Sequence, residues 1–312
     1  MPTFSRRWFV AALAAAWVGG LASAARAEAL EPQAVDRIVA LDRDTTLSPA
    51  AKESAIRAAF QAFQARHAAA LSDLSTASAE TLGEWGRLLG FVVYATHHDR
   101  ALLGPLAQLR QAYARRGMVP PLALRARLVS AWVGFRDFDT ARAVAAEMDT
   151  PLEDLPPVET AAGAEAAAAT VLRVDAEYGV LRREPLSLGD APHLVVVSFI
   201  GCAFSRRAAD AIEAHPALRQ AMREHSTWIV EPGPLHFSEV RAWNRQHPST
   251  AFTYVDGLAP WAFIDDWATP TFYVVRAGRL LNKFQGWPDD AQGVATLLSA
   301  LASAGLVMPA PR

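Results

Sequence analysis

The hydrophobic pattern of the chain changes across a proline-rich segment, residues 150–157, and this change limits the folds that the sequence allows. Before the segment, apolar side chains recur at the three- and four-residue spacing of helices. After it, short apolar runs alternate with helical segments, which is typical of a sheet with connecting helices. The sequence therefore predicts a helical domain over residues 28–157 and an α/β domain over residues 158–312.

The first part is expected to be all-α, with short connections that favour helical hairpins. Ser48 and Pro49 are placed as the N-cap and first residue of a helix. The expected helices cover residues 50–71, 78–94, 101–116, 121–135 and 139–148. Residues 128–148 resemble a tetratricopeptide hairpin, with Trp132, Phe138 and Ala141 at its aromatic and small positions. No second copy follows at a fixed period, so a plain helical bundle remains an alternative.

The second part is expected to form a mixed sheet with helices on both faces. A hairpin is predicted around Gly179, within residues 171–188, and another around Gly278, within residues 271–287. Further strands are predicted at residues 193–200, 227–230 and 251–255, and helices at residues 205–223, 237–246 and 290–304.

The N-terminus has the features of an export signal. Arg6 and Arg7 precede an apolar stretch that ends in the small-residue site Ala25-Arg26-Ala27. This pattern predicts a signal peptide over residues 1–27 and a periplasmic protein without a membrane anchor after cleavage. The paired arginines also resemble a twin-arginine signal. An uncleaved anchor remains an alternative, because the apolar run approaches the length of a membrane span.

Composition excludes few function classes. The chain is 52% hydrophobic with a formal charge of -2, so no basic excess points to nucleic acid. A single cysteine, Cys202, excludes a disulfide within the chain. In an oxidising compartment, a lone cysteine indicates a reactive thiol, a partner cysteine or burial. No cofactor or metal is expected, since His97 and His98 have no further ligand nearby in sequence and are assigned to solvation of a helix end.

Two segments resemble the TlpA-type periplasmic thiol–disulfide reductases, which have a thioredoxin-like fold. LSLGDAPHLVVVSFIGCAFSRR resembles the segment that leads into the family's C-x-x-C motif, with Phe199 at its aromatic position and Cys202 as its first cysteine. ATPTFYVVRAGRLLNKFQGW resembles its second landmark, with Pro270 as the cis-proline that faces the cysteine. The resemblance covers about residues 171–306 and leaves the helical part unmatched.

The motif departs from the family at its second cysteine. Ser205 takes that place, and Gly201 replaces the usual tryptophan. Dithiol exchange needs a second thiol to release the bound substrate, which serine cannot provide. The resemblance therefore implies monothiol chemistry at most, a monothiol thiol–disulfide oxidoreductase if the chain is an enzyme.

The resemblance implies a small set of site residues. Catalytic roles fall to Cys202, Ser205 and Pro270, and substrate contacts to Thr269 and Phe204. A thiol at a helix N-terminus is favoured as the thiolate, and we expect Arg206 and Arg207 to add positive charge.

Two functions stay open at this point. In the first, an exported thioredoxin-like protein forms mixed disulfides with protein or small thiols. In the second, the chain is a non-enzymatic periplasmic binding or assembly factor that combines a degenerate thioredoxin scaffold with the helical part. Protein partners, some of them bearing cysteine, are expected in both, and the sequence leaves the oligomeric state open.

Overall fold

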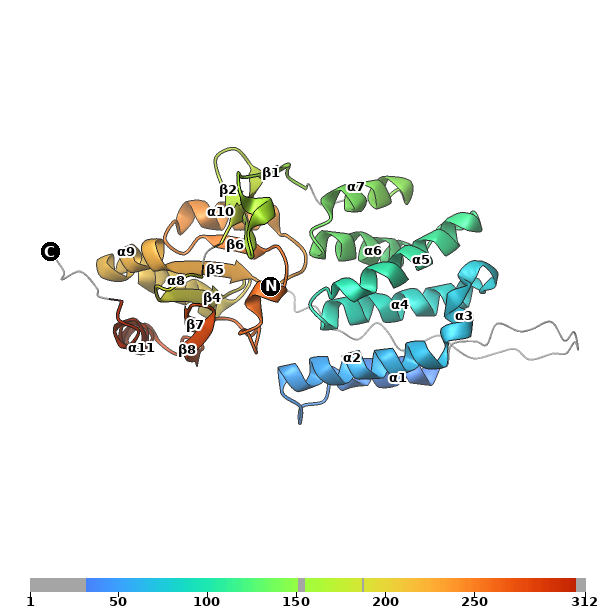
Figure 1. Ribbon diagram of the computed structural model, residues 1–312, viewed down its shortest axis with the longest axis horizontal. Helices are drawn as coiled ribbons and strands as arrows, with labels where there is room; N and C mark the ends of the chain where they lie inside the picture. Colours follow the sequence, from blue (N-terminus) through green and yellow to red (C-terminus); the bar gives the residue numbers. More distant parts are fainter. Residues whose placement is uncertain (1–31, 151–154, 187, 307–312) are drawn as a thin grey trace, which may run out of the picture.

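The computed structural model describes residues 32–150, 155–186 and 188–306. The signal peptide predicted for residues 1–27 lies outside these ranges. A stack of helices, the helical region, stands beside a sheet with its own helices, the sheet domain (Figure 1). Within the described ranges, no helix has both the length and the apolar character that crossing a membrane requires.

The helical region contains every helix predicted from the sequence, with one division. Its helices are α1 (Pro32–Leu41), α2 (Pro49–Arg66), α3 (Ala68–Ser72), α4 (Ala79–Ala95), α5 (Leu103–Arg115), α6 (Leu122–Gly134) and α7 (Phe138–Glu147), with 3-10 turns η1 (Leu74–Thr76) and η2 (Arg100–Leu102). Ser48 caps α2 as expected, because its Oγ accepts the Ala51 N–H at 3.3 Å. The expected helix over residues 50–71 is divided at His67, whose backbone leaves the helical conformation and whose buried ring packs on Phe63.

The predicted hairpin between residues 121 and 148 is present as α6 and α7, which pack against each other. Trp132, Phe138 and Ala141 are all buried there. Burial of these three side chains fits a tetratricopeptide hairpin and a plain bundle equally, so membership of the repeat family stays a prediction.

The sheet domain is built on eight strands in the order β1-β3-β2-β6-β5-β4-β7-β8. The strands are β1 (Val158–Thr160), β2 (Thr170–Asp175), β3 (Val180–Pro185), β4 (His193–Val197), β5 (Ser226–Val230), β6 (Phe252–Val255), β7 (Thr271–Arg276) and β8 (Arg279–Gln285). Both predicted hairpins form, as β2–β3 and β7–β8. The sequence analysis missed β1, a three-residue edge strand parallel to β3.

The connections between strands are mostly helical. They comprise the helices α8 (Ala203–Ala214), α9 (Pro216–His225) and α10 (Phe237–Gln246) and the 3-10 turns η3 (Ala164–Ala166) and η4 (Ala259–Trp261). The helix α11 (Asp290–Ser303) follows the last strand and closes the domain. The single helix predicted for residues 205–223 is wrong, because Pro216 begins a new helix. His215 caps that helix, its Nδ1 accepting the Leu218 N–H at 3.3 Å.

The prediction of helices on both faces of the sheet is also wrong. Buried side chains of α8, α9, α10 and α11 all join the apolar cluster on one face. The other face is covered by η4 and its neighbours, including Trp261 and Ile264. The reason is topological. Strands β4, β5 and β6 are parallel and step in one direction across the sheet, so right-handed crossovers place both sets of connecting helices on the same side.

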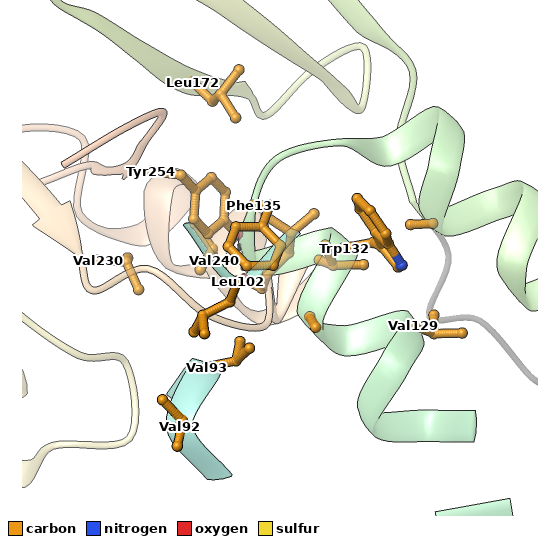
Figure 2. Close-up of a cluster of buried hydrophobic side chains, with 14 of the residues drawn as sticks. Val92, Val93, Leu102, Val129, Trp132, Phe135, Leu172, Val230, Val240 and Tyr254 are labelled. Atoms are coloured by element: carbon orange, nitrogen blue, oxygen red, sulfur yellow. Dashed lines mark hydrogen bonds between the residues drawn. The ribbon is translucent and has the colours of Figure 1, made fainter. Parts of the chain in front are cut away.

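The helical region and the sheet domain share one continuous apolar core. Figure 2 shows Phe135 and Leu102 of the helical region grouped with Tyr254 and Val240 of the sheet domain. The contact lies where β5 and β6 end. Parallel strands end at one edge of a sheet, and in open α/β sheets that edge is where ligands bind. The helical region is therefore seated on the edge of the sheet at which these parallel strands end (Figure 2).

Candidate functional site

Cys202 lies at this same edge, directly after the central strand β4. The chain leaves β4 at Val197, and Cys202 is the N-cap residue of α8. Four buried β4 side chains, Leu194 to Val197, anchor the strand between β5 and β7. The thiol is free and partly exposed. The fold thus presents one thiol at the positive end of a twelve-residue helix.

The second predicted landmark lies beside the thiol. The Thr269–Pro270 peptide bond is cis, as the resemblance implied. Cys202 Sγ donates a hydrogen bond to the Thr269 carbonyl oxygen at 3.3 Å. Pro270 is buried and Thr269 is partly exposed at the start of β7. The structure therefore brings together Cys202, Ser205, Thr269 and Pro270, whose roles in catalysis and binding remain predictions.

The surroundings of the thiol favour the thiolate. Burial alone raises the pKa of Cys202, but the side chain of Thr269, the backbone N–H groups of Ser205 and Phe204, and the Ser205 hydroxyl lower it by more, so the net pKa lies below that of a free thiol. No side-chain hydrogen bond of normal geometry joins Cys202 to the first turn of α8. These groups therefore act on the sulfur as nearby dipoles that are aligned to stabilise a negative charge.

Ser205 is fully buried, and its Oγ has no hydrogen-bond partner among the described residues. A buried hydroxyl without an acceptor is costly, and a thiolate on Cys202 would give it one. Of the neighbouring arginines, Arg207 donates to the Pro288 carbonyl at 3.1 Å. The effect of Arg206 and Arg207 on the thiol stays a prediction.

Two exposed aromatic rings lie next to the thiol in sequence. Phe204 is 51% exposed in the first turn of α8, and Phe199 is 41% exposed in the preceding loop. A Cβ at Gly201 would lie 2.6 Å from the Phe199 ring, so a larger residue there would displace this exposed ring. Two exposed aromatic side chains thus lie within three residues of Cys202 along the chain.

The helical region reaches this edge through His97. Its Nδ1 lies 3.3 Å from a Glu53 carboxylate oxygen on α2, and its Nε2 lies 3.2 Å from a carboxylate oxygen of Glu231, which follows β5. The His97 ring also contacts the Trp267 ring, with centroids 5.6 Å apart. Burial lowers the pKa of His97, but the two carboxylates outweigh it and raise the pKa to about 9. An imidazolium therefore bridges the two parts of the chain at neutral pH.

A second cation, the buried Arg136, also joins the helical region to the sheet domain. Its Nε donates to the Val255 carbonyl at 3.0 Å, and its Nη1 donates to the Gly233 carbonyl at 2.8 Å. The guanidinium also lies over the Tyr254 ring, 5.4 Å from its centroid. Arg136 is 6% exposed, and its contacts cross from the helical region to the end of β6 and to the loop after β5.

Beside these contacts lies a cavity of about 410 Å³ between the two parts. Its lining comes from the helical region and from the loops after β5 and β6, and includes Arg57, His97, His98, Pro232, Asp256 and Leu258. His98 is buried against Phe135, and burial, with Arg136 nearby, lowers the pKa of His98 to about 4.

The sequence analysis missed this boundary. His97 and His98 were assigned to solvation of a helix end, but both lie in a connection with left-handed backbone, and both make tertiary contacts. Glu231 and Trp267, the partners of His97 in the sheet domain, lie more than a hundred residues from it, so spacing along the sequence gave no signal of these contacts. Within the described ranges no group of three or more His, Cys, Asp or Glu residues is placed to hold a metal ion.

Comparison with known proteins adds little to this geometry. No family model matches the sequence, and no curated protein matches it. Among solved structures, a thioredoxin-like protein from Bacteroides caccae is similar over 86% of this chain and 94% of that chain, at 12% identity and a TM-score of 0.27. A TM-score of 0.27 does not establish a shared fold. The thioredoxin-like description rests on the chain itself: a helical region, then a mixed sheet domain with Cys202 at a helix start opposite a cis-proline.

Proposed function

We propose that this chain is an exported, monothiol thioredoxin-like protein of the TlpA type that forms mixed disulfides through Cys202. The observation that carries the proposal is the placement of a free, partly exposed thiol at the N-cap of α8, 3.3 Å from the Thr269 carbonyl, with a lowered pKa. A thiol kept only for packing would be buried in apolar surroundings, where its pKa would rise.

The chemistry follows from the presence of a single thiol. The Cys202 thiolate attacks one sulfur of a partner disulfide, a new S–S bond forms to Cys202, and the other partner sulfur leaves as a thiolate. Ser205 has no sulfur with which to break that bond. A thiolate from a second partner, a protein or a small thiol, must attack the mixed disulfide and release Cys202. No net electrons stay on the protein, which acts as a carrier in exchange between partners.

The surrounding residues fit a polypeptide substrate. Phe199 and Phe204 are exposed aromatic side chains within three residues of Cys202, and they would offer apolar contacts to a partner. Thr269 and Pro270 supply backbone groups beside the sulfur, where an extended segment of a partner would lie. The helical region, seated on the same edge of the sheet, narrows the approach to Cys202 and selects among partners.

Trapping of mixed disulfides tests the proposal. Purified protein is incubated with a peptide disulfide and with extracts of the exported fraction, quenched with acid, and analysed by mass spectrometry. We expect adducts on Cys202 of the native chain and none on Cys202→Ser. Ser205→Cys is the informative companion, because a second thiol should resolve the adducts and reduce their yield. Absence of adducts on the native chain over a range of partners would contradict the proposal.

A second function is favoured by one observation, the absence of a resolving thiol combined with a large helical region on the edge of the sheet at which the parallel strands end. In that case the chain is a non-enzymatic binding or assembly factor, and its surface rather than its thiol matters. The two functions separate cleanly. Cys202→Ala abolishes the first function, and it leaves partner binding by the second intact.

Export belongs to the proposal as well. The first 27 residues carry the sequence pattern of a cleaved signal, and periplasmic localisation follows from it. Fractionation of cells that express the full chain, with Arg6→Lys/Arg7→Lys as the twin-arginine control, tests both the compartment and the route.

A further inference from the structure

His97 stands in a connection that only a special backbone allows. It follows α4 with a φ of 50°, and His98 follows with a φ of 61°. Residues other than glycine rarely adopt the left-handed region, and two in succession are uncommon. The connection is held by the His98 N–H, which donates to the Val93 carbonyl at 2.8 Å. The backbone therefore fixes His97 at the boundary at a conformational cost.

His97 contacts three elements that are distant in sequence. Glu53 lies on α2 of the helical region, whereas Glu231 and Trp267 belong to two different loops of the sheet domain. The His97 side chain is 18% exposed, so both ion pairs are partly shielded from water. Such pairs contribute more than pairs on an open surface.

The two loops that His97 contacts are the loops that flank Cys202. Glu231 begins residues 231–236, and the His236 ring at their end contacts the Phe199 ring, with centroids 6.1 Å apart. Trp267 lies two residues before Thr269, whose carbonyl accepts the hydrogen bond from Cys202. One loop thus connects His97 to Phe199, three residues before Cys202, and the other connects His97 to Thr269, which contacts the thiol.

Other contacts keep the two parts together when His97 is changed. Arg136 donates hydrogen bonds to the end of β6 and to the loop after β5, and Phe135 packs into the shared core. Loss of His97 is therefore expected to loosen residues 231–236 and 265–270 without separating the helical region from the sheet domain.

From these contacts we infer that His97 is a positioning residue that fastens both loops flanking Cys202 to the helical region, and so limits the size of the partner that reaches the thiol. The claim that His97 positions the two loops is based on these contacts alone. The claim that the loops limit access to the thiol rests on the proposed function, since it requires a reactive thiol.

Hydrogen exchange tests whether His97 positions the two loops. The variants are His97→Gln and Glu231→Gln, which break the same contact from opposite sides, with His225→Gln as the matched control. His225 also pairs with a carboxylate, that of Glu224 at 3.6 Å, but on an exposed surface. We expect amides of residues 231–236 and 265–270 to exchange about tenfold faster in both test variants, from the loss of one charged contact. Exchange in β4 and β5 should stay unchanged and shows that the variants are folded.

Thiol labelling tests whether the loops limit access to the thiol. Cys202 is labelled with iodoacetamide, which is small, and with a polyethylene-glycol maleimide, which is bulky. We expect the ratio of bulky to small labelling to rise several-fold in both test variants and not in His225→Gln, as the loops open.

The outcomes separate the two ideas. Unchanged exchange in His97→Gln and Glu231→Gln overturns the positioning role. Faster exchange with an unchanged labelling ratio overturns the control of access. If the native thiol reacts with neither reagent even at alkaline pH, the proposed function and the control of access fall together, while the exchange result still decides whether His97 positions the loops.

Discussion

Cys202 Sγ lies 3.3 Å from the carbonyl oxygen of Thr269, although 67 residues separate them in the chain. The contact joins the start of α8 to the residue before the cis-proline, two features that different parts of the sheet bring to one edge. It holds the Cys202 sulfur between the N-terminus of α8 and the backbone of Thr269. Four predictions follow from this site and from the boundary beside it.

Ser205→Ala should slow the thiol without weakening the fold. Removing the hydroxyl takes away one of the groups that lower the pKa of Cys202, so less thiolate exists at neutral pH. A hydrogen bond worth about 1 kcal/mol corresponds to alkylation that is about fivefold slower. Because the hydroxyl is buried with no partner among the described residues, unfolding stability should stay equal or rise. Alkylation rates against pH, with urea unfolding alongside, provide the check, and unchanged rates would argue that Ser205 does not act on the sulfur.

His97 should make stability depend on pH in the alkaline range. The pKa of His97 is raised from 6.5 to about 9 in the fold, so its stabilising effect is complete below pH 6.5 and is lost as the pH rises through 9. That interval corresponds to at most about 3 kcal/mol. The groups around it are Glu53 and Glu231, with Arg57, Asp99 and His98 close by.

Urea unfolding of the native chain and of His97→Gln between pH 6 and 10 measures this effect. The difference in unfolding free energy between the two should shrink as the pH rises toward 10. His225→Gln, at an exposed pair, should show no such trend. A constant difference across the range would mean that His97 is not charged in the folded protein.

Gly134→Ala should be strongly destabilising. A Cβ at Gly134 would lie 2.0 Å from the His98 ring, which is itself buried against Phe135. Overpacking of this kind costs about 1–3 kcal/mol. Gly83→Ala is the control, because nothing lies within 4 Å of its Cβ and α4 should gain about 1 kcal/mol of helix propensity. Thermal unfolding of both variants gives the answer, and equal midpoints would contradict the packing described.

Arg136→Met should weaken the joint between the two parts. The change keeps an unbranched, flexible stem but removes the guanidinium, so the buried carbonyls of Val255 and Gly233 lose their donor. The expected loss of unfolding free energy is about 2–4 kcal/mol. Arg116→Met, on an exposed residue, should change stability by less than about 0.5 kcal/mol. Denaturant unfolding distinguishes the two, and similar small effects would show that Arg136 does not hold the boundary.

Local sequence signals predicted most of the secondary structure. Ser48 and Pro49 start α2, and Gly179 and Gly278 turn the two hairpins, because caps and left-handed turns depend on residues within a few positions. Pro216 is a local signal of the same kind, because a proline favours the first turn of a helix and here begins α9. The missed strand β1 has three residues and no pattern of its own, so only its pairing with β3 defines it.

The sequence by itself determined the helical first half, the strands of the second half other than β1, and the chemical limit set by a single cysteine with Ser205 three residues later. Each of these depends on residue type and on spacing along the chain. The tertiary structure decided which face of the sheet carries the helices, and that Thr269 lies against Cys202. It also decided that His97 and Arg136 join the two halves. These outcomes depend on strand order and on contacts between residues that are far apart in sequence. The spacing of residue types along one chain does not specify which distant residues come into contact.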